Sequence, residues 1–433
     1  MGGEWKDASL SELIKLQRGH DLTDSERHPG EIPVMGSAGQ NGYHNTSKAK
    51  GPGLVIGRSG ASFGRVHFSE TDYWPHNTAL YVTDFLGNDE LFTFHLLKTI
   101  DFSSYNSGSA QPSLNRNHIY LIPVKIPPLP EQKAIAHILG SLDDKIELNR
   151  RMNATLEGMV QALFKSWFVD FDPVIDNALA AGNLIPEELA ERAEVRRQAL
   201  ADGTANREAA KQFPAAFQLS EEMGWIPEGW VVSTIGDEVT AVGGGTPSTA
   251  NALFWNGTHP FCTPKDMSSL SSLVLSDTER HLTDVGANKI SSGILPEGTL
   301  LMSSRAPIGY LAISEKPATV NQGIIALVKN DTYQPMFLLS WLRSNMEKII
   351  ERANGSTFLE ISKKNFKPIP FLRPSEKVLT LFNIPANSIH RKIVNCVSNT
   401  NYLTNLRDTL LPKLISGELR IPAAEKLTEE ALA

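Results

Sequence analysis

The chain has 433 residues, of which 41% are apolar and 21% are charged, and these values are ordinary for a globular protein of two or three domains. Two cysteines far apart exclude a disulfide framework, and without a signal peptide or a long apolar run we expect a cytoplasmic protein that does not span a membrane. The net charge of −7 argues against a strongly basic nucleic-acid binder, although positive surface can still be local.

The first domain expected from the sequence spans residues 1–126. An amphipathic segment at residues 9–16 precedes a polar, glycine-rich loop. Residues 32–82 are rich in alternating and β-branched positions, with glycines at the turns, which is typical of short strands. We expect a helix at residues 89–100, a polar loop at 107–119 and a final strand before Pro127. This domain is therefore predicted to combine sheet and helix.

A long helix is predicted at residues 127–170. No proline occurs between Glu131 and Phe168, and Glu131 suits the positive end of the helix dipole. Apolar residues at alternating steps of three and four predict a coiled-coil seam: Ile135, Ile138, Leu142, Met152, Leu156, Met159 and Leu163. A helix of this length spans about 57 Å, too long for the interior of one small domain, so it indicates a spacer.

Residues 171–225 are expected to form a charged linker with a surface helix at 186–200, and the rest of it is expected to be either a mobile linker or a small helical appendage. The pattern of the first domain then starts again, and residues 226–373 are predicted to be a second domain. The matching positions, first copy before second, are Trp5 and Trp230, Leu10 and Ile235, Gly64 and Gly309, Asn77 and Asn321, Gly108 and Gly355, and Pro123 and Pro370. This repeat predicts that both domains share one topology.

A second long helix is predicted at residues 374–417, interrupted at Pro385, and a tail follows at 418–433. Two seamed helices in one chain pair most simply with each other, in antiparallel orientation. The predicted fold class is therefore α+β, with two related globular domains at opposite ends of a two-helix antiparallel coiled coil and a pseudo-twofold relation within the chain.

The sequence contains little that indicates catalysis. It has no Gly-Lys dipeptide, hence no P-loop, and the glycine cluster at 243–245 lacks the spacing of a dinucleotide site. No metal-site spacing occurs either. Residues 131–133 resemble half of a nuclease motif, but glutamate is favoured at a helix start in any case. We expect no catalytic residue, metal or cofactor in this chain.

Polar loops that recur in both copies are the candidates for DNA binding. Arginine can grip guanine with two hydrogen bonds, while serine, asparagine and glutamine can contact bases or phosphates. The candidates are Arg58, Ser59, Ser62, Arg65, Asn77, Gln111, Asn115, Arg116 and Asn117 in the first copy, and Ser303, Ser304, Arg305, Asn321, Lys363, Lys364 and Asn365 in the second. The alternative is that each is a solvated turn residue.

An apolar and aromatic cluster ends the first long helix, formed by Leu163, Phe164, Trp167 and Phe168. Two interpretations are open. The side chains could pack against the adjoining domain, or they could bind a partner protein, because aromatic anchors carry much of the energy of such interfaces.

The chain resembles the specificity subunit of type I DNA restriction-modification systems over nearly its whole length. The resemblance rests on the segments at residues 126–149, 159–174, 226–230, 354–370 and 410–419. It implies two target recognition domains that each read half of a bipartite DNA site, and two helices that space the halves and bind two modification (methyltransferase) subunits. It also implies restriction subunits in the same assembly, with S-adenosylmethionine, ATP and Mg²⁺ used by those partners.

Two other functions stay open on the sequence. The chain could be the recognition part of a single-chain restriction-methylation enzyme, although the methylase motifs are absent from it. It could also be a scaffold with two protein-binding heads. The leading interpretation is a non-catalytic DNA-recognition subunit.

Overall fold

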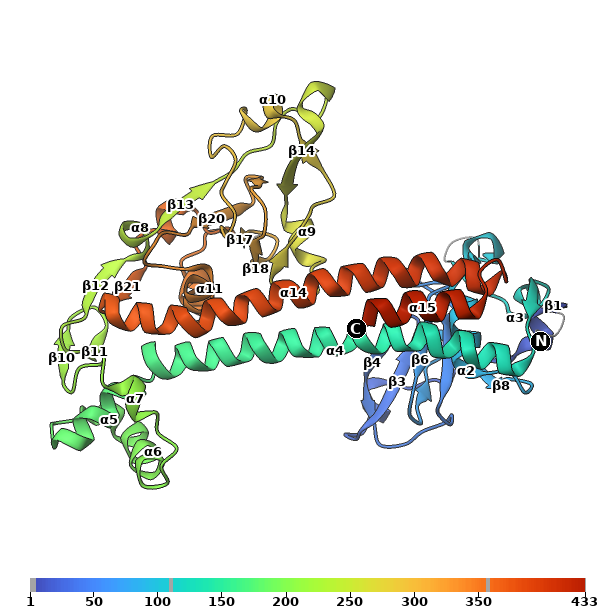
Figure 1. Cartoon of the computed structure of the whole chain (residues 1–433), viewed down its shortest axis with the longest axis horizontal. Coiled ribbons are helices and arrows are strands. Elements are labelled where there is room, and N and C mark those ends of the chain that lie inside the picture. Colours follow the sequence, from blue (N-terminus) through green and yellow to red (C-terminus); the bar gives the residue numbers. More distant parts are fainter. Residues whose placement is uncertain (1–4, 109–111, 356–358, 433) are drawn as a thin grey trace. The chain divides into compact units, whose positions relative to one another are not determined.

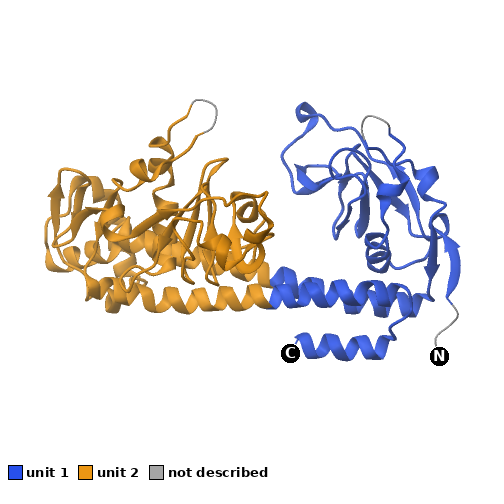
Figure 2. Cartoon of the chain, turned by 90° about the horizontal axis from the view of Figure 1, so that it is seen from above, with its two compact units in different colours: residues 1–148, 399–433 blue, residues 149–398 orange. Residues whose placement is uncertain are grey.

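The computed structural model describes residues 5–108, 112–355 and 359–432. The chain forms two compact units, residues 1–148 with 399–433 (unit 1) and residues 149–398 (unit 2) (Figure 2). Two 40-residue helices, α4 (Leu129–Phe168) and α14 (Glu376–Ile415), each contribute one part to either unit (Figure 1). Within the described residues, no helix is both long enough and apolar enough to cross a membrane.

Unit 1 has a four-stranded sheet in the order β2-β8-β5-β6, a three-stranded sheet β4-β3-β7 and the pair β1-β9. The strands are β1 (Lys6–Ser9), β2 (Lys15–Arg18), β3 (Ile32–Gly36), β4 (Gly39–His44), β5 (Gly53–Gly57), β6 (Val66–Ser69), β7 (Trp74–Pro75), β8 (Ala79–Asp84) and β9 (Pro123–Ile126). The helices besides α4 and α14 are α1 (Leu10–Leu13), η1 (Asp24–Glu26), α2 (Glu90–Lys98), η2 (Phe102–Tyr105), α3 (Arg116–Ile119) and α15 (Ile421–Leu432).

The core of unit 1 lies between its larger sheet and its helices. Ile56 and Leu80 from the sheet, Phe92 from α2 and Leu142 from α4 are buried in one cluster with Leu410 of α14. Residues 418–433, expected as a tail, contain α15, whose Ala424 is buried in the same cluster. The alternating pattern of the strands and the helical pattern of α4 thus meet at one apolar layer.

Unit 2 repeats this plan with a five-stranded sheet β13-β20-β17-β18-β15, a three-stranded sheet β16-β14-β19 and the pair β12-β21. The strands are β12 (Val231–Thr234), β13 (Thr240–Gly243), β14 (Trp255–Cys262), β15 (Val274–Leu275), β16 (His281–Leu282), β17 (Leu300–Ser304), β18 (Ile308–Ser314), β19 (Thr319–Val320), β20 (Ile324–Val328) and β21 (Pro370–Arg373). The helices are α8 (Ile235–Glu238), η4 (Ala252–Phe254), α9 (Pro264–Ser268), α10 (Asp284–Ala287), α11 (Pro335–Ser344), α12 (Met346–Glu351) and α13 (Lys363–Phe366).

Equivalent backbone hydrogen bonds show which residue of unit 1 corresponds to which residue of unit 2. Leu10 N donates to Ile122 O at 2.9 Å, and Ile235 N donates to Ile369 O at 3.0 Å. The same holds for Leu114 N to Arg58 O and Ile361 N to Ser304 O, for Arg58 N to Thr78 O and Ser304 N to Gly323 O, and for His20 N to Pro75 O and Gly245 N to Val320 O. The repeat predicted from the sequence is therefore confirmed in three dimensions.

Two of the expected matches test this alignment directly. Gly64 and Gly309 are equivalent, and both have a positive φ, which glycine adopts without steric cost. The expected match of Asn77 with Asn321 is wrong by one residue. His76 N and Asn321 N donate to equivalent carbonyls, those of Met35 and Cys262, so Asn77 corresponds to Gln322.

Helices α4 and α14 run antiparallel within unit 2, because Met152 Sδ lies 3.6 Å from Cys396 Sγ and the rings of Phe164 and Phe382 are 6.0 Å apart. The expected seam is correct at Ile135 and Leu142, which are buried, and at Met152, which contacts Cys396 of α14 although it is 43% exposed. The seam is wrong at Met159, which is 55% exposed. Val160 is buried in place of Met159, and Asn153, next to Met152, is buried as well. Val160 lies four residues before Phe164, hence on the same face of α4, and both are buried in the core of unit 2, while Met159 lies beside this face.

The expected interruption at Pro385 is wrong, because α14 continues through it. Proline removes one helical hydrogen bond and costs roughly 3 kcal/mol in a helix interior. Phe382 and Ala386 on either side of Pro385 are fully buried in the core of unit 2, and this packing offsets the cost.

The connection at residues 171–225 forms a helical appendage, one of the two expected alternatives, and it contains more helices than the one at 186–200. It contains α5 (Asp172–Ala181), η3 (Glu187–Leu189), α6 (Ala190–Ala201), α7 (Arg207–Ala210) and the hairpin β10 (Phe217–Ser220) with β11 (Gly224–Pro227). Asp172 and Asp176 of α5 are buried, and each binds an arginine of α6 through two hydrogen bonds, Arg192 and Arg196 respectively. Buried carboxylates need such partners, and the ion pairs hold α6 against α5.

Candidate nucleic-acid interface

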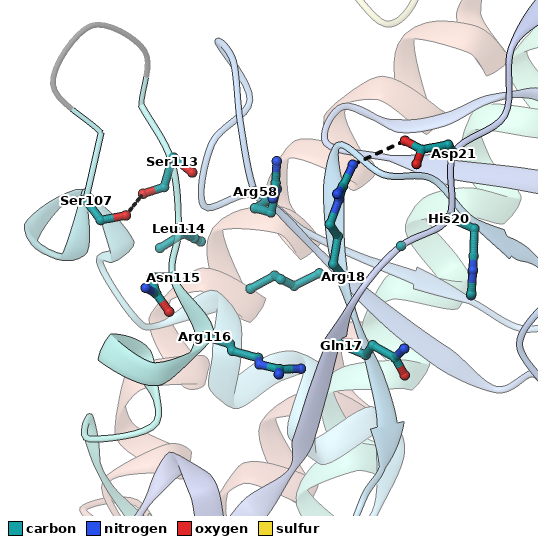
Figure 3. A pocket seen from close by; sticks show the side chains of 12 residues that line it. Gln17, Arg18, His20, Asp21, Arg58, Ser107, Ser113, Leu114, Asn115 and Arg116 are labelled. Carbon is teal, nitrogen blue, oxygen red and sulfur yellow. Dashed lines mark hydrogen bonds and ion pairs between the residues drawn. The ribbon is translucent and has the colours of Figure 1, made fainter.

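A polar pocket of about 650 Å³ opens in unit 1 beside the end of β2 (Figure 3). It lies between the segment at residues 17–21 and the segment at residues 113–116. Its lining residues are Gln17, Arg18, Gly19, His20, Asp21, Arg58, Leu80, Ser107, Ser113, Leu114, Asn115 and Arg116. Three arginines in one open pocket form a local positive surface on a chain that is acidic as a whole.

Gly19 brings the segment at 17–21 close to β7. A side chain at this position would place its Cβ atom 2.1 Å from the carbonyl oxygen of His76, so only glycine fits. The equivalent Gly244 of unit 2 lies as close to Val320 O, at 1.7 Å for a Cβ atom. The crossing of these backbone segments is thus a shared feature of both units, and it fixes where the neighbouring side chains emerge.

The arginines of the pocket are held in different ways. Arg18 Nη2 donates to Asp21 Oδ1 at 3.2 Å, and Asn77 Nδ2 donates to the same oxygen. The hydrogen bond from Asn77, together with the nearby charge of Arg18, holds the pKa of Asp21 below its usual range, so Asp21 is ionised at neutral pH. Arg116 Nη1 donates to Leu16 O at 3.2 Å.

The structure brings only part of the first candidate set together. Arg58, Asn115 and Arg116 line the pocket, and Asn115 also caps α3 by accepting a hydrogen bond from Asn117 N at 3.0 Å. Asn77 acts through Asp21. Ser59, Ser62, Arg65 and Asn117 lie outside the lining, and Gln111 lies outside the described residues. Gln17, Arg18 and Asp21 line the pocket but were not predicted from the sequence. The feature that could have indicated them was the polar loop that follows the first amphipathic segment.

Two candidates in unit 2 are buried and belong to the fold. Ser303 is fully buried, donates its hydroxyl to Pro307 O at 2.8 Å and accepts from Tyr310 N at 2.8 Å. Ser304 is 3% exposed, and its backbone N–H and C=O form the hydrogen bonds with Gly323 and Ile361 that were described above. The expectation that Ser303 and Ser304 are available to DNA is therefore wrong, because both side chains are buried within the domain.

The remaining candidates of unit 2 differ in accessibility. Lys363 and Lys364 are exposed on α13, and Arg305 lies 3.8 Å from Glu360 in a partly exposed ion pair. Asn321 and Asn365 are occupied by the local fold. Asn321 Oδ1 accepts from Gly323 N at 2.9 Å, and Asn365 Nδ2 donates to Arg352 O at 3.1 Å. Lys363 and Lys364 are thus exposed toward a ligand, and Arg305 is partly exposed within its ion pair.

The residue alignment shows that the two units share equivalent backbone positions but carry different charged side chains at them. Arg18 corresponds to Gly243, Arg58 to Ser304, Ser59 to Arg305 and Arg116 to Lys363. The Lys363 side chain lies over Gly243, where an added Cβ atom would be 3.3 Å from Lys363 Cε. The positive groups are therefore redistributed between equivalent positions rather than repeated.

The aromatic end of α4 belongs to the core of unit 2. Phe164, Trp167 and Phe168 are 2%, 6% and 8% exposed, and their rings contact Phe382 of α14. Leu163 is partly buried against the same cluster. Packing against the adjoining domain is the correct interpretation, and these side chains do not form an exposed partner surface.

The sequence of the chain matches a known protein family. Residues 2–158 and 227–378 match the family "Type I restriction modification DNA specificity domain". The HindI specificity subunit of Haemophilus influenzae is 32% identical over 357 residues, which cover 76% of this chain and 77% of that protein. The MjaIX specificity subunit of Methanocaldococcus jannaschii is 34% identical over 177 residues, which cover 40% and 41% of the two chains.

The fold also has a solved counterpart. The crystal structure of the type I restriction-modification S subunit from M. genitalium superposes with a TM-score of 0.56 at 16% identity, over 95% of this chain and 96% of that chain. The family match covers both copies of the repeat and most of the chain. This chain belongs to the family of type I restriction-modification DNA specificity subunits.

Proposed function

We propose that this chain is the non-catalytic DNA-recognition subunit of a type I restriction-modification complex, and that it reads a bipartite, asymmetric DNA site. Residues 1–126 and 226–373 are the two target recognition domains of this proposal. The observation that carries it is that both units share the same pattern of backbone hydrogen bonds but place different cationic side chains on it. These side chains are Arg18, Arg58 and Arg116 in unit 1, and Arg305 and Lys363 in unit 2. Because the backbone patterns agree and the side chains differ, the two half-sites should differ in sequence.

The pocket chemistry suits DNA. Arginine and lysine contact phosphates through charge and guanine through its major-groove acceptors. The net charge of −7 limits nonspecific affinity, because such affinity comes mainly from counterion release at cationic surfaces. The lone chain should therefore bind DNA modestly, and more tightly within its complex.

Modification and restriction subunits are the proposed protein partners. They would bring S-adenosylmethionine, ATP and Mg²⁺, while this chain supplies the recognition of sequence. The buried position of Trp167 and Phe168 removes the aromatic end of α4 from the candidate docking surfaces.

A footprint tests the proposal against its alternatives. The full chain, co-expressed with the modification subunit, should protect two short DNA patches separated by an unprotected gap. A protein scaffold would protect none, and a single-chain enzyme would methylate DNA when purified alone. Absence of any sequence-dependent protection would overturn the proposed function.

We further propose that α4 and α14 set the gap between the half-sites. Inserting one heptad after Met152 and a matching heptad before Cys396 keeps these two residues in the same pairing but lengthens both helices by about 10 Å, or about three base pairs. The tolerated gap should grow by that amount while both half-sites stay the same, as methylome sequencing would reveal. A heptad in α4 alone is the control, because it breaks the pairing and should destabilise the chain. An altered half-site with a constant gap would contradict the ruler.

A further inference from the structure

Arg18 stands out among the pocket residues because its orientation is prepared before any ligand binds. Its side chain is 53% exposed and forms an ion pair with Asp21, which lies three residues further along the chain. Figure 3 shows the Arg18 guanidinium at the pocket, with Arg58 beside it in this view and the contact to Asp21 drawn. A long cationic side chain that is already oriented loses less rotamer entropy on binding.

A second contact orients the carboxylate itself. Asn77, from the loop before β8, donates to Asp21 Oδ1, the oxygen that Arg18 also uses. In the part of the chain that the structure describes, no hydrogen bond occupies Arg18 Nε or Nη1. The planar guanidinium is therefore held through Nη2, while Nε and Nη1 can donate to a ligand in the pocket.

Unit 2 keeps the same contact pair without its charge. Asp21 corresponds to Thr246 and Asn77 to Gln322, and Thr246 Oγ1 donates to Gln322 Oε1 at 2.6 Å. At the position of Arg18, unit 2 has Gly243. In unit 1, which has Arg18, the residue that binds this arginine is the ionised Asp21. In unit 2, which has no arginine at this position, the neutral residues Thr246 and Gln322 form the equivalent contact.

We propose that Arg18 reads a guanine in the half-site of unit 1, with Asp21 and Asn77 as positioning residues, and that unit 2 has no equivalent contact. This inference rests on the proposed function and names the residue through which it acts. The chemistry fits because the rigid fork of arginine matches the O6 and N7 acceptors that guanine presents in the major groove. Position 18/243 is then one place where the two half-sites diverge.

The test uses the full chain co-expressed with the modification subunit to select binders from a library of randomised DNA duplexes, which are then sequenced. Arg18→Ala should lower the preference for guanine at one position of one half-site by roughly 10- to 100-fold and leave the other half-site unchanged. Arg18→Lys keeps the charge but loses the fork, so it should not restore the preference. Asp21→Asn should relax the same position partially.

Lys125→Ala is the matched control, because Lys125 is an exposed cation of unit 1 on β9, outside the pocket. It should leave both half-sites as they are. Uniformly weaker binding of Arg18→Ala to all sequences, with a salt dependence reduced by about one charge, would show a phosphate contact and overturn the inference. An unchanged preference in Arg18→Ala or a restored one in Arg18→Lys would also overturn it. A wild-type complex that selects no sequence would instead overturn the proposed function.

Discussion

Replacing Phe168 with alanine should lower the free energy of unfolding of unit 2 by about 3–5 kcal/mol, the usual cost of removing a large buried aromatic side chain. The Phe168 ring lies 5.1 Å from that of Phe337 on α11, 5.3 Å from that of Phe382 on α14 and 5.9 Å from that of Trp230. One side chain therefore joins α4, α11 and α14, and its removal leaves a cavity that three elements surround. Hydrogen exchange followed by mass spectrometry would measure the loss of protection in residues 335–344.

Met159→Ala is the control on the same helix. Met159 is 55% exposed, so its truncation should change the free energy of unfolding by no more than about 0.5 kcal/mol. The exchange of unit 1 should be unaffected by either substitution. Equal destabilisation by both substitutions would contradict the assignment of Phe168 to the core and of Met159 to the surface.

The aromatic end of α4 shows where prediction from sequence stops. Spacing alone identifies a helix through Phe164, Trp167 and Phe168, and the structure confirms that helix to within two residues. Spacing does not reveal what covers the helix, because a core and a partner interface both select large apolar side chains. The deciding contacts come from Phe337 and Phe382, which lie more than 160 residues away in the chain.

The repeat was readable because it depends on backbone geometry. Glycines and prolines with positional roles, such as Gly64 with Gly309 and Pro123 with Pro370, occur at equivalent positions in both copies. The pocket was less readable because its chemistry changes between copies. Arg18 corresponds to Gly243, so a search for polar residues that recur in both copies passes over this position.

Acidification should destabilise unit 1 through His95, the second large effect we expect. His95 lies on α2, is fully buried, and neither ring nitrogen has a hydrogen-bond partner within the described residues. Burial lowers the pKa of His95 from 6.5 to about 4, although Asp143 at 3.9 Å opposes this shift, while Lys98 and Arg407 add to it. The folded state thus keeps this imidazole neutral.

The sign follows from proton uptake. Between pH 6.5 and 4 the unfolded chain binds a proton at His95 and the folded chain does not, so the stabilisation is complete above pH 6.5 and is lost as the pH falls. The shift corresponds to about 3 kcal/mol over this window. His67, whose pKa is also lowered by burial, adds a contribution of the same sign. Denaturant unfolding of the full chain, with hydrogen exchange to separate the units, would measure this slope.

A leucine at position 95 separates this mechanism from general acid unfolding. His95→Leu keeps an apolar side chain against Phe94 and removes the titrating group, so the pH dependence of unit 1 between pH 6.5 and 4 should fall to the part that His67 contributes. His118→Leu removes an exposed histidine and should leave the slope unchanged. Carboxylates such as Asp21 and Asp72, whose pKa values are already lowered by hydrogen bonds, titrate below this window and cannot replace His95 in it. A slope in His95→Leu as steep as that of the wild type would place the acid sensitivity of unit 1 elsewhere.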